Sequence, residues 1–69
     1  MVVVDQVVRF DAFAYVSGGL EKHTLMVTGT VYEVNYAHKV FHVAYKIGGI
    51  EQRTSFKFCD IGNKVHICK

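Results

Sequence analysis

The sequence contains no proline and no tryptophan, and only two of its 69 residues are cysteines. The lack of proline excludes a proline-rich linker and fits a compact sheet with tight glycine turns. The two cysteines, Cys59 and Cys68, are too few for the disulfide framework that holds small secreted domains together. We therefore expect free thiols and a reducing, cytoplasmic setting.

Long apolar runs are also missing. Asp5 interrupts the valines that follow Met1, so the start lacks the basic region and long apolar stretch of a signal peptide. Nowhere do about 18 apolar residues run together, so we expect no membrane-spanning segment. Neither sign of charge dominates, since the net charge is only +2. That value does not by itself indicate nucleic-acid binding, which normally needs a concentrated patch of Lys and Arg.

The chain is rich in hydrophobic residues, at 51%, and 20% of its residues are charged. This composition excludes a disordered chain or a coiled coil. We expect residues 1–69 to form a single domain, because the chain is too short for a second core. A chain of this length lies near the lower limit for an autonomous core, so we expect a homodimer or a protein partner.

The stretch "KVFHVAYKIGGIEQRTSFKF" predicts a β-hairpin whose turn is Gly48-Gly49. A two-residue turn of type I′ or II′ needs positive φ, which glycine adopts without steric cost. This register separates an apolar face from a polar one, and a slip by one residue would expose Phe41. The apolar face pairs Ile47 with Ile50, Tyr45 with Gln52, Val43 with Thr54 and Phe41 with Phe56. The polar face pairs Lys46 with Glu51, Ala44 with Arg53, His42 with Ser55 and Val40 with Lys57.

The stretch "HTLMVTGTVYEVN" before the hairpin is rich in Val and Thr, which favours a strand. Gly29 in its interior indicates a bulge or a sharp bend. A four-residue loop at 36–39 would then place three residues opposite the hairpin: Val34 opposite Phe41, Glu33 opposite His42 and Tyr32 opposite Val43. After the hairpin, Gly62-Asn63 predicts a turn that leads into a short strand from Lys64 to Cys68.

The first segment, "VVRFDAFAYVSGG", allows two interpretations. A period of two gives Val8, Phe10, Ala12 and Ala14 one shared face, whereas a period of 3.6 makes a helical stripe from Val3 to Asp11. The many Val, Phe and Tyr residues favour a strand, which would end in a turn at 17–19. The expected fold is all-β: a small, strongly bent antiparallel sheet or barrel of about five strands, SH3-like or Sm-like, with little or no helix.

Sequence signals for catalysis or metal binding are weak. Zinc sites usually take paired ligands at short spacing, such as Cys-x-x-Cys, and the two cysteines here are nine positions apart. Gly18-Gly19 and Gly48-Gly49 are turn glycines, which do not open a helix as a phosphate-binding loop does. A barrel of this size also offers little concavity for a small molecule. We therefore expect no enzyme activity, no metal, no cofactor and no small-molecule substrate.

Two surfaces are candidates for binding. The apolar residues of the first segment are too many for a strand with one wet face. If Val3, Val7, Phe13 and Tyr15 form its second face, they predict association with a protein partner or a second copy. Burial of both faces inside one barrel is the alternative.

The polar face of the hairpin is the second candidate, because His42, Lys46, Arg53 and Lys57 project from it. Small barrels bind single-stranded nucleic acid with basic residues interleaved with aromatic ones. The predicted register assigns Tyr32, Tyr45 and Phe41 to the inner face, which leaves three aromatic residues for stacking: Phe13, Tyr15 and Tyr36. An ordinary solvated face is the alternative.

The stretch "LMVTGTVYEVN" resembles the first Sm motif, in which an apolar strand reaches a glycine-bent strand and then Asn or Asp. The region from Thr24 to Ile67 is also similar to the YolD-like proteins of Firmicutes and their phages. Two motifs carry that resemblance: Gly29-Thr30-Val31 in a "G-x-[IV]" strand, and "F-x-D-I" at 58–61. The second Sm motif is absent, which argues against ring assembly and uridine binding. The resemblance implies a small bacterial or phage accessory protein, and it assigns no functional residues.

Together these features predict a non-enzymatic interaction module that binds a protein partner, or itself, through its apolar N-terminal strand. The alternative is a nucleic-acid-binding barrel that uses its basic sheet face.

Overall fold

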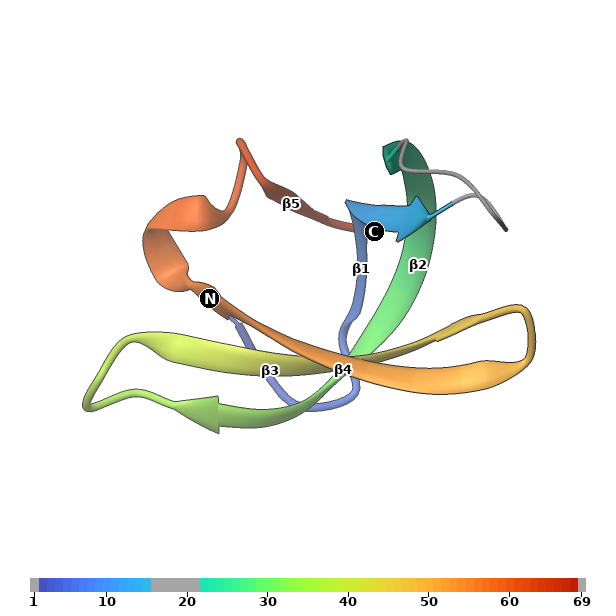
Figure 1. The fold of residues 1–69 in the computed structure, drawn as a ribbon. Helices are drawn as coiled ribbons and strands as arrows, with labels where there is room; N and C mark the ends of the chain where they lie inside the picture. The colour runs from blue at the N-terminus through green and yellow to red at the C-terminus, as the bar shows by residue number, and fades with distance from the viewer. Residues whose placement is uncertain (1, 16–21, 69) are drawn as a thin grey trace.

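The structure is a computed structural model that describes the backbone of residues 2–15 and 22–68, and the side chains of residues 2–12 and 26–68. Its strands form one antiparallel sheet in the order β4-β3-β2-β1-β5 (Figure 1). The sheet bends strongly but does not close into a barrel. In chain order the elements are β1 (Val7–Tyr15), β2 (Lys22–Asn35), β3 (Val40–Ile47), β4 (Ile50–Lys57), the 3-10 helix η1 (Phe58–Asp60) and β5 (Val65–Ile67).

The all-β prediction is confirmed, and the first segment is a strand rather than a helix. Val8, Phe10 and Ala12 of β1 are buried, as the period of two predicts. The side chain of Ala14 and the predicted turn at 17–19 lie outside the residues described.

The β3–β4 hairpin has the predicted register at all eight pairs, from Val40 with Lys57 to Ile47 with Ile50. Gly48 has φ of 58° and Gly49 has φ of 79°. Positive φ at both central residues is what a type I′ turn requires, and this turn matches the twist of the flanking strands. The turn therefore fixes the register, which places the apolar residues of β3 on the core side of the sheet.

The long strand β2 belongs to both halves of the sheet. Its residues 22–30 pair with β1, and its residues 29–35 pair with β3. In Figure 1 the β3–β4 hairpin crosses below the part of the sheet formed by β1, β5 and the beginning of β2. Gly29 is the point of transfer, because it pairs with Val8 on one side and with Tyr45 on the other.

Gly29 leaves no room for a side chain. A Cβ atom there would lie 2.5 Å from Cγ1 of Val43 and 2.9 Å from the carbonyl oxygen of Ala44. Gly29 therefore allows a close approach of β3 to β2. A bulge at Gly29 is not found, since its pairing is regular on both sides.

The bulge lies further along β2, at Tyr32. Val31 is opposite Val43 and Glu33 is opposite His42, so Tyr32 is the extra residue between them. The prediction that Tyr32 faces Val43 is wrong, whereas the pairing of Glu33 with His42 and that of Val34 with Phe41 are confirmed. Because one residue is inserted, Val31 takes the buried position and Tyr32 turns outward.

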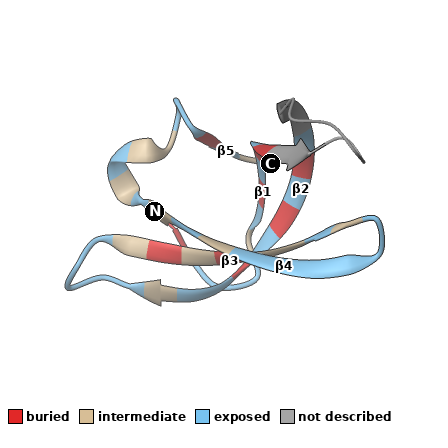
Figure 2. Cartoon of the chain, in the orientation of Figure 1, coloured by how far each residue is buried: buried red, intermediate tan, exposed pale blue. Residues whose placement is uncertain are grey.

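The core lies inside the curve of the sheet, with buried residues on β1, β2, β3 and β5 (Figure 2). Aromatic rings join β1 to the β3–β4 hairpin at the side of this core. The ring of Phe10 meets those of Tyr45 and Phe56 edge to face, each at 5.0 Å between centroids. The fully or almost fully buried residues are Val2, Val8, Phe10, Ala12, Val27, Val31, Phe41, Val43 and Val65.

The chain returns to β1 through η1 and a tight turn. The carboxylate of Asp60 accepts a hydrogen bond of 3.0 Å from the backbone N–H of Lys57, at the start of η1. Gly62 has φ of 92° in the turn that follows. β5 then pairs with β1, with Val65 buried and His66 exposed. The predicted turn and closing strand are confirmed.

The close approach at Gly29 makes a mutational prediction. Gly29→Ala should lower the free energy of unfolding by about 2–3 kcal/mol, because the carbonyl of Ala44 is backbone and cannot move aside without disturbing β3. Urea denaturation followed by circular dichroism measures this change.

Gly48→Asn is the matched control. Nothing lies within 4 Å of the position that its Cβ would take, and Asn tolerates positive φ in a type I′ turn, so stability should change by less than about 0.5 kcal/mol. Equal losses from the two variants would contradict the proposed role of Gly29.

Candidate interaction surfaces

A β-turn at residues 3–6 precedes β1. The carbonyl of Val3 accepts a hydrogen bond of 3.3 Å from the backbone N–H of Gln6. Asp5, the third residue of the turn, has φ of 74°, as a type II turn requires. The side-chain oxygen of Gln6 accepts a second hydrogen bond, of 3.2 Å, from the N–H of Val3. These bonds define the shape of the turn.

The turn is attached to β2 at the bulge. Val31 accepts a hydrogen bond of 2.8 Å from Asp5 and donates one of 2.9 Å to Gln6. Val2 is buried in the core, with 2% of its surface exposed. The hydroxyl of Tyr36 donates a hydrogen bond of 2.7 Å to the carbonyl of Val2. The segment before β1 is therefore held on both sides of the turn.

Three valines in the turn and at the start of β1 are exposed to solvent, and we call them the valine turn: Val3, Val4 and Val7. Their exposed fractions are 45%, 50% and 40%. Single exposed apolar residues are normal on a protein surface, but a group of them is typical of an association site.

The predicted N-terminal surface is found only in part. Val3 and Val7 are exposed, but Val3 precedes β1 and does not share a strand face with Val7. The side chains of Phe13 and Tyr15 lie outside the residues described. The outer face of β1 also carries exposed Arg9 and Asp11, so it is not a continuous apolar surface.

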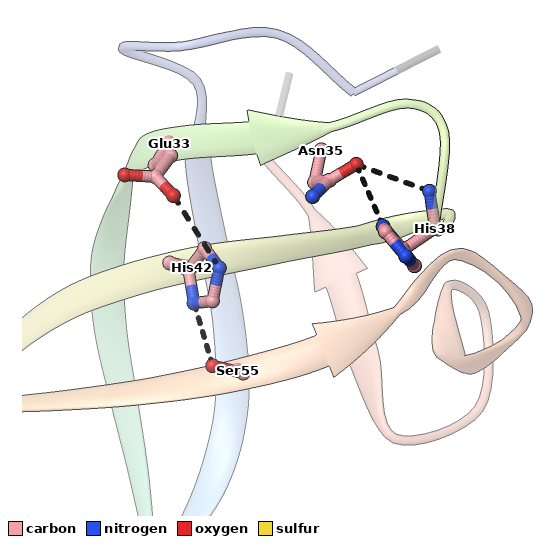
Figure 3. Close-up of polar contacts among 5 residues, drawn as sticks. All are labelled: Glu33, Asn35, His38, His42 and Ser55. Atoms are coloured by element: carbon pink, nitrogen blue, oxygen red, sulfur yellow. Dashed lines mark hydrogen bonds and ion pairs between the residues drawn. The ribbon is translucent and has the colours of Figure 1, made fainter.

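The predicted basic residues His42, Lys46, Arg53 and Lys57 lie together on the outer face of the β3–β4 hairpin. His42 is held between two neighbouring strands (Figure 3). Its Nε2 lies 3.7 Å from a carboxylate oxygen of Glu33 on β2, and its Nδ1 lies 2.6 Å from Oγ of Ser55 on β4. In the same view, Asn35 accepts a hydrogen bond of 3.0 Å from the backbone N–H of His38.

Acidic side chains reduce the positive charge of this face. The guanidinium of Arg53 lies 3.6 Å from a carboxylate oxygen of Glu51. Lys46 is opposite Glu51 in the sheet, as predicted. Lys46, Arg53 and Lys57 thus share their face with two carboxylates, those of Glu33 and Glu51. The face is mixed in charge, which weakens its attraction for a polyanion.

Tyr32 is the aromatic residue that the sequence analysis missed on this face. It is 41% exposed. The guanidinium carbon of Arg53 lies 5.3 Å from the centroid of its ring, and the ring of His42 lies 6.0 Å away. These distances are in the range for a cation–π contact and for aromatic packing. A regular register would place Tyr32 opposite Val43 on the inner face. The residue inserted at the bulge reverses the direction of its side chain.

A groove runs beside β4, on the side where the sheet does not close; we call it the β4 groove. Its volume is about 590 Å³, and its lining residues are Phe10, Asp11, Ala12, Tyr45, Thr54, Phe56, Asn63 and Lys64. Apolar side chains from β1, β3 and β4 meet there, with polar groups from the turn before β5. A domain of this size was expected to offer little concavity, whereas the open side of the sheet leaves this groove.

Cys59 and Cys68 are exposed and carry free thiols, as expected. Within the described part of the chain, no three His, Cys, Asp or Glu side chains come close enough to hold a metal ion. No helix among residues 2–15 and 22–68 has the length and apolar character to cross a membrane.

Comparison of the chain with protein-family models, curated proteins and solved structures found no match.

The bulge predicts that Val31→Ala destabilises the protein more than Tyr32→Ala, and a regular strand would predict the opposite order. Val31→Ala should lower the free energy of unfolding by about 2 kcal/mol, because it removes two methyl groups from the core and leaves a cavity. Tyr32→Ala should cost less than about 1 kcal/mol, because its ring is exposed. Urea denaturation of both variants gives the comparison. A larger loss from Tyr32→Ala than from Val31→Ala would contradict the bulge.

Proposed function

We propose that this protein is a non-enzymatic interaction module that binds a protein partner through the valine turn. The observation that carries the proposal is the exposure of Val3, Val4 and Val7 on one short segment. Removing apolar area from water contributes about 25 cal/mol per Å², so covering three valines would favour association.

The conformation of the turn supports this proposal. Backbone hydrogen bonds to Val31 hold Asp5 and Gln6, and the buried Val2 anchors the start of the segment. A partner would therefore meet a surface that is already ordered, and binding would cost little conformational entropy. Flexible exposed valines would offer the same area at a higher entropic cost.

The fold identity that we propose is that of the SH3-like or Sm-like domains, here with an open sheet. The order β4-β3-β2-β1-β5, with β5 returning to β1 after a 3-10 turn, supports it. The resemblance to the YolD-like proteins supports a bacterial or phage accessory protein, acting in the cytoplasm.

Affinity capture from a bacterial lysate tests the valine turn. The variant with Val3→Asp and Val4→Asp should lose the proteins that the unchanged chain retains, because a partner would have to bury two carboxylates. Capture by the unchanged chain should hold or strengthen as salt rises, since the contact is apolar. Retained proteins are compared by mass spectrometry, and circular dichroism checks that the variant is folded.

Met26→Lys is the matched control, because Met26 is also an exposed apolar residue, at 55%, but lies on β2 opposite Asp11, which the new charge would complement. It should leave capture unchanged. Identical capture by all three chains, or no capture by any, would contradict the proposal.

Binding of single-stranded nucleic acid by the outer face of the β3–β4 hairpin is the second candidate function. The exposed ring of Tyr32 beside Arg53 favours it, because base stacking on an aromatic ring is typical of such surfaces. Lys46 and Lys57 would contact phosphates, while Glu33 and Glu51 oppose them.

Fluorescence anisotropy with a labelled oligonucleotide tests this second function. The variant with Arg53→Glu and Lys57→Glu should lose binding, and Tyr32→Ala should weaken it by about 1–3 kcal/mol through the loss of one stacked base. Affinity should fall steeply as salt rises. Unchanged affinity in the charge variant would eliminate the nucleic-acid function.

A further inference from the structure

Strand β4 is a long edge of the sheet. It comes first in the strand order, and among the described residues no strand pairs with its outer side. All eight of its residues pair with β3 on the inner side. Figure 2 shows that most of β4 is exposed. A free edge of this length can pair with another chain.

The direction of each backbone group along β4 follows from the hairpin. Phe58 donates a backbone hydrogen bond of 2.9 Å to Lys39, in the ladder that continues from β3 and β4. Because bonded and non-bonded pairs alternate in an antiparallel ladder, four residues turn their backbone groups outward: Glu51, Arg53, Ser55 and Lys57. The N–H of Lys57 is already donated to the carboxylate of Asp60, so a ladder on this edge would end there.

The side chains of these four residues are exposed on the outer face of the strand, and their charges run negative, positive, neutral, positive. Identical charges on an edge would repel a second copy, and natural proteins protect edges in this way. Here the pattern is complementary to itself in one full-length antiparallel register. A two-fold axis at Thr54 places Glu51 opposite the partner's Lys57 at both ends and Arg53 opposite the partner's Ser55 in the middle.

The neighbouring registers of the β4–β4 pairing are less favourable, either in the charges that face each other or in the length of strand that is paired. An axis at Arg53 would place two guanidinium groups directly opposite each other, and an axis at Ser55 would place Arg53 opposite the partner's Lys57. Like charges directly opposite are destabilising. An axis at Gln52 brings opposite charges together but pairs a shorter part of the strand. Charge and length together select the axis at Thr54.

The β4 groove provides space for the added strand. Thr54 and Phe56 lie on its β4 side, and Phe10 and Ala12 lie on its β1 side. A strand added to β4 continues the curve of the sheet over this groove. Since side chains alternate between the two faces of a strand, the inner residues of the added β4 would point into the groove. Its apolar lining would then be covered.

We propose that two copies of this chain associate through their β4 strands, antiparallel about a two-fold axis at Thr54. In this dimer Glu51 of each subunit faces Lys57 of the partner subunit, and each β4 groove receives inner side chains of the other copy. The surface is separate from the valine turn, so the dimer does not depend on the proposed function.

Sedimentation velocity from low micromolar to near-millimolar concentration tests the dimer. The unchanged chain should form a dimer and no larger species. Glu51→Lys alone should raise the dissociation constant about tenfold or more, because lysines then face each other at both ends of the pairing. Lys57→Glu alone should do the same with glutamates. The variant with Glu51→Lys and Lys57→Glu should restore dimerisation, because the pairs are exchanged.

Arg9→Glu is the matched control, since Arg9 is also an exposed cation but lies on β1, opposite Thr28 and His66. It should leave the dimer unchanged. Hydrogen exchange should show protection of the amides of Arg53 and Ser55 that disappears in the single variants.

Several results would overturn this proposal. They are a monomer at every concentration, assemblies larger than two copies, or failure of the double variant to restore the dimer. Rescue of Glu51→Lys by Arg53→Glu instead would move the axis to Gln52. Loss of the dimer in the variant with Val3→Asp and Val4→Asp would assign self-association to the valine turn, whereas loss of partner capture with an intact dimer would leave both proposals standing.

Discussion

The close packing of β3 against β2 at Gly29 joins the two halves of the sheet. A side chain at this position would collide with Val43 and with the carbonyl of Ala44. Because β2 pairs with β1 before this point and with β3 after it, the core exists only if both partners approach the same strand. The buried residues of β1 and β3 then meet around Phe10, whose ring contacts Tyr45 and Phe56.

The bulge at Tyr32 decides which side chains reach the surface beyond that junction. It moves Val31 into the core and turns Tyr32 outward, beside Arg53. The same site receives the N-terminal turn, because the backbone of Val31 bonds to Asp5 and Gln6. One inserted residue therefore shapes both candidate surfaces, the mixed-charge face of the hairpin and the valine turn.

A chain of 69 residues buries a small core, and we propose that two of its exposed features serve association. The valine turn offers apolar side chains on a backbone that is already ordered, which suits a protein partner. The β4 edge offers unpaired backbone groups, a self-complementary charge pattern and an apolar groove, which suit a second copy. The two surfaces are formed by different segments, so a dimer would present two valine turns.

Local patterns determined much of this fold by themselves. Gly48-Gly49 and the alternation around them determined the register from Val40 to Lys57, because a two-residue turn and one buried face leave no other pairing. The burial of Val8, Phe10 and Ala12 followed from their period of two. The sequence could not show that Tyr32 is a bulge residue, because a bulge depends on contacts with both neighbouring strands. It could not show that Val2 enters the core, or that the valines beside it stay outside. The open edge of β4 and its groove were decided by the tertiary structure alone, since they depend on how far the sheet curls before β5 returns to β1.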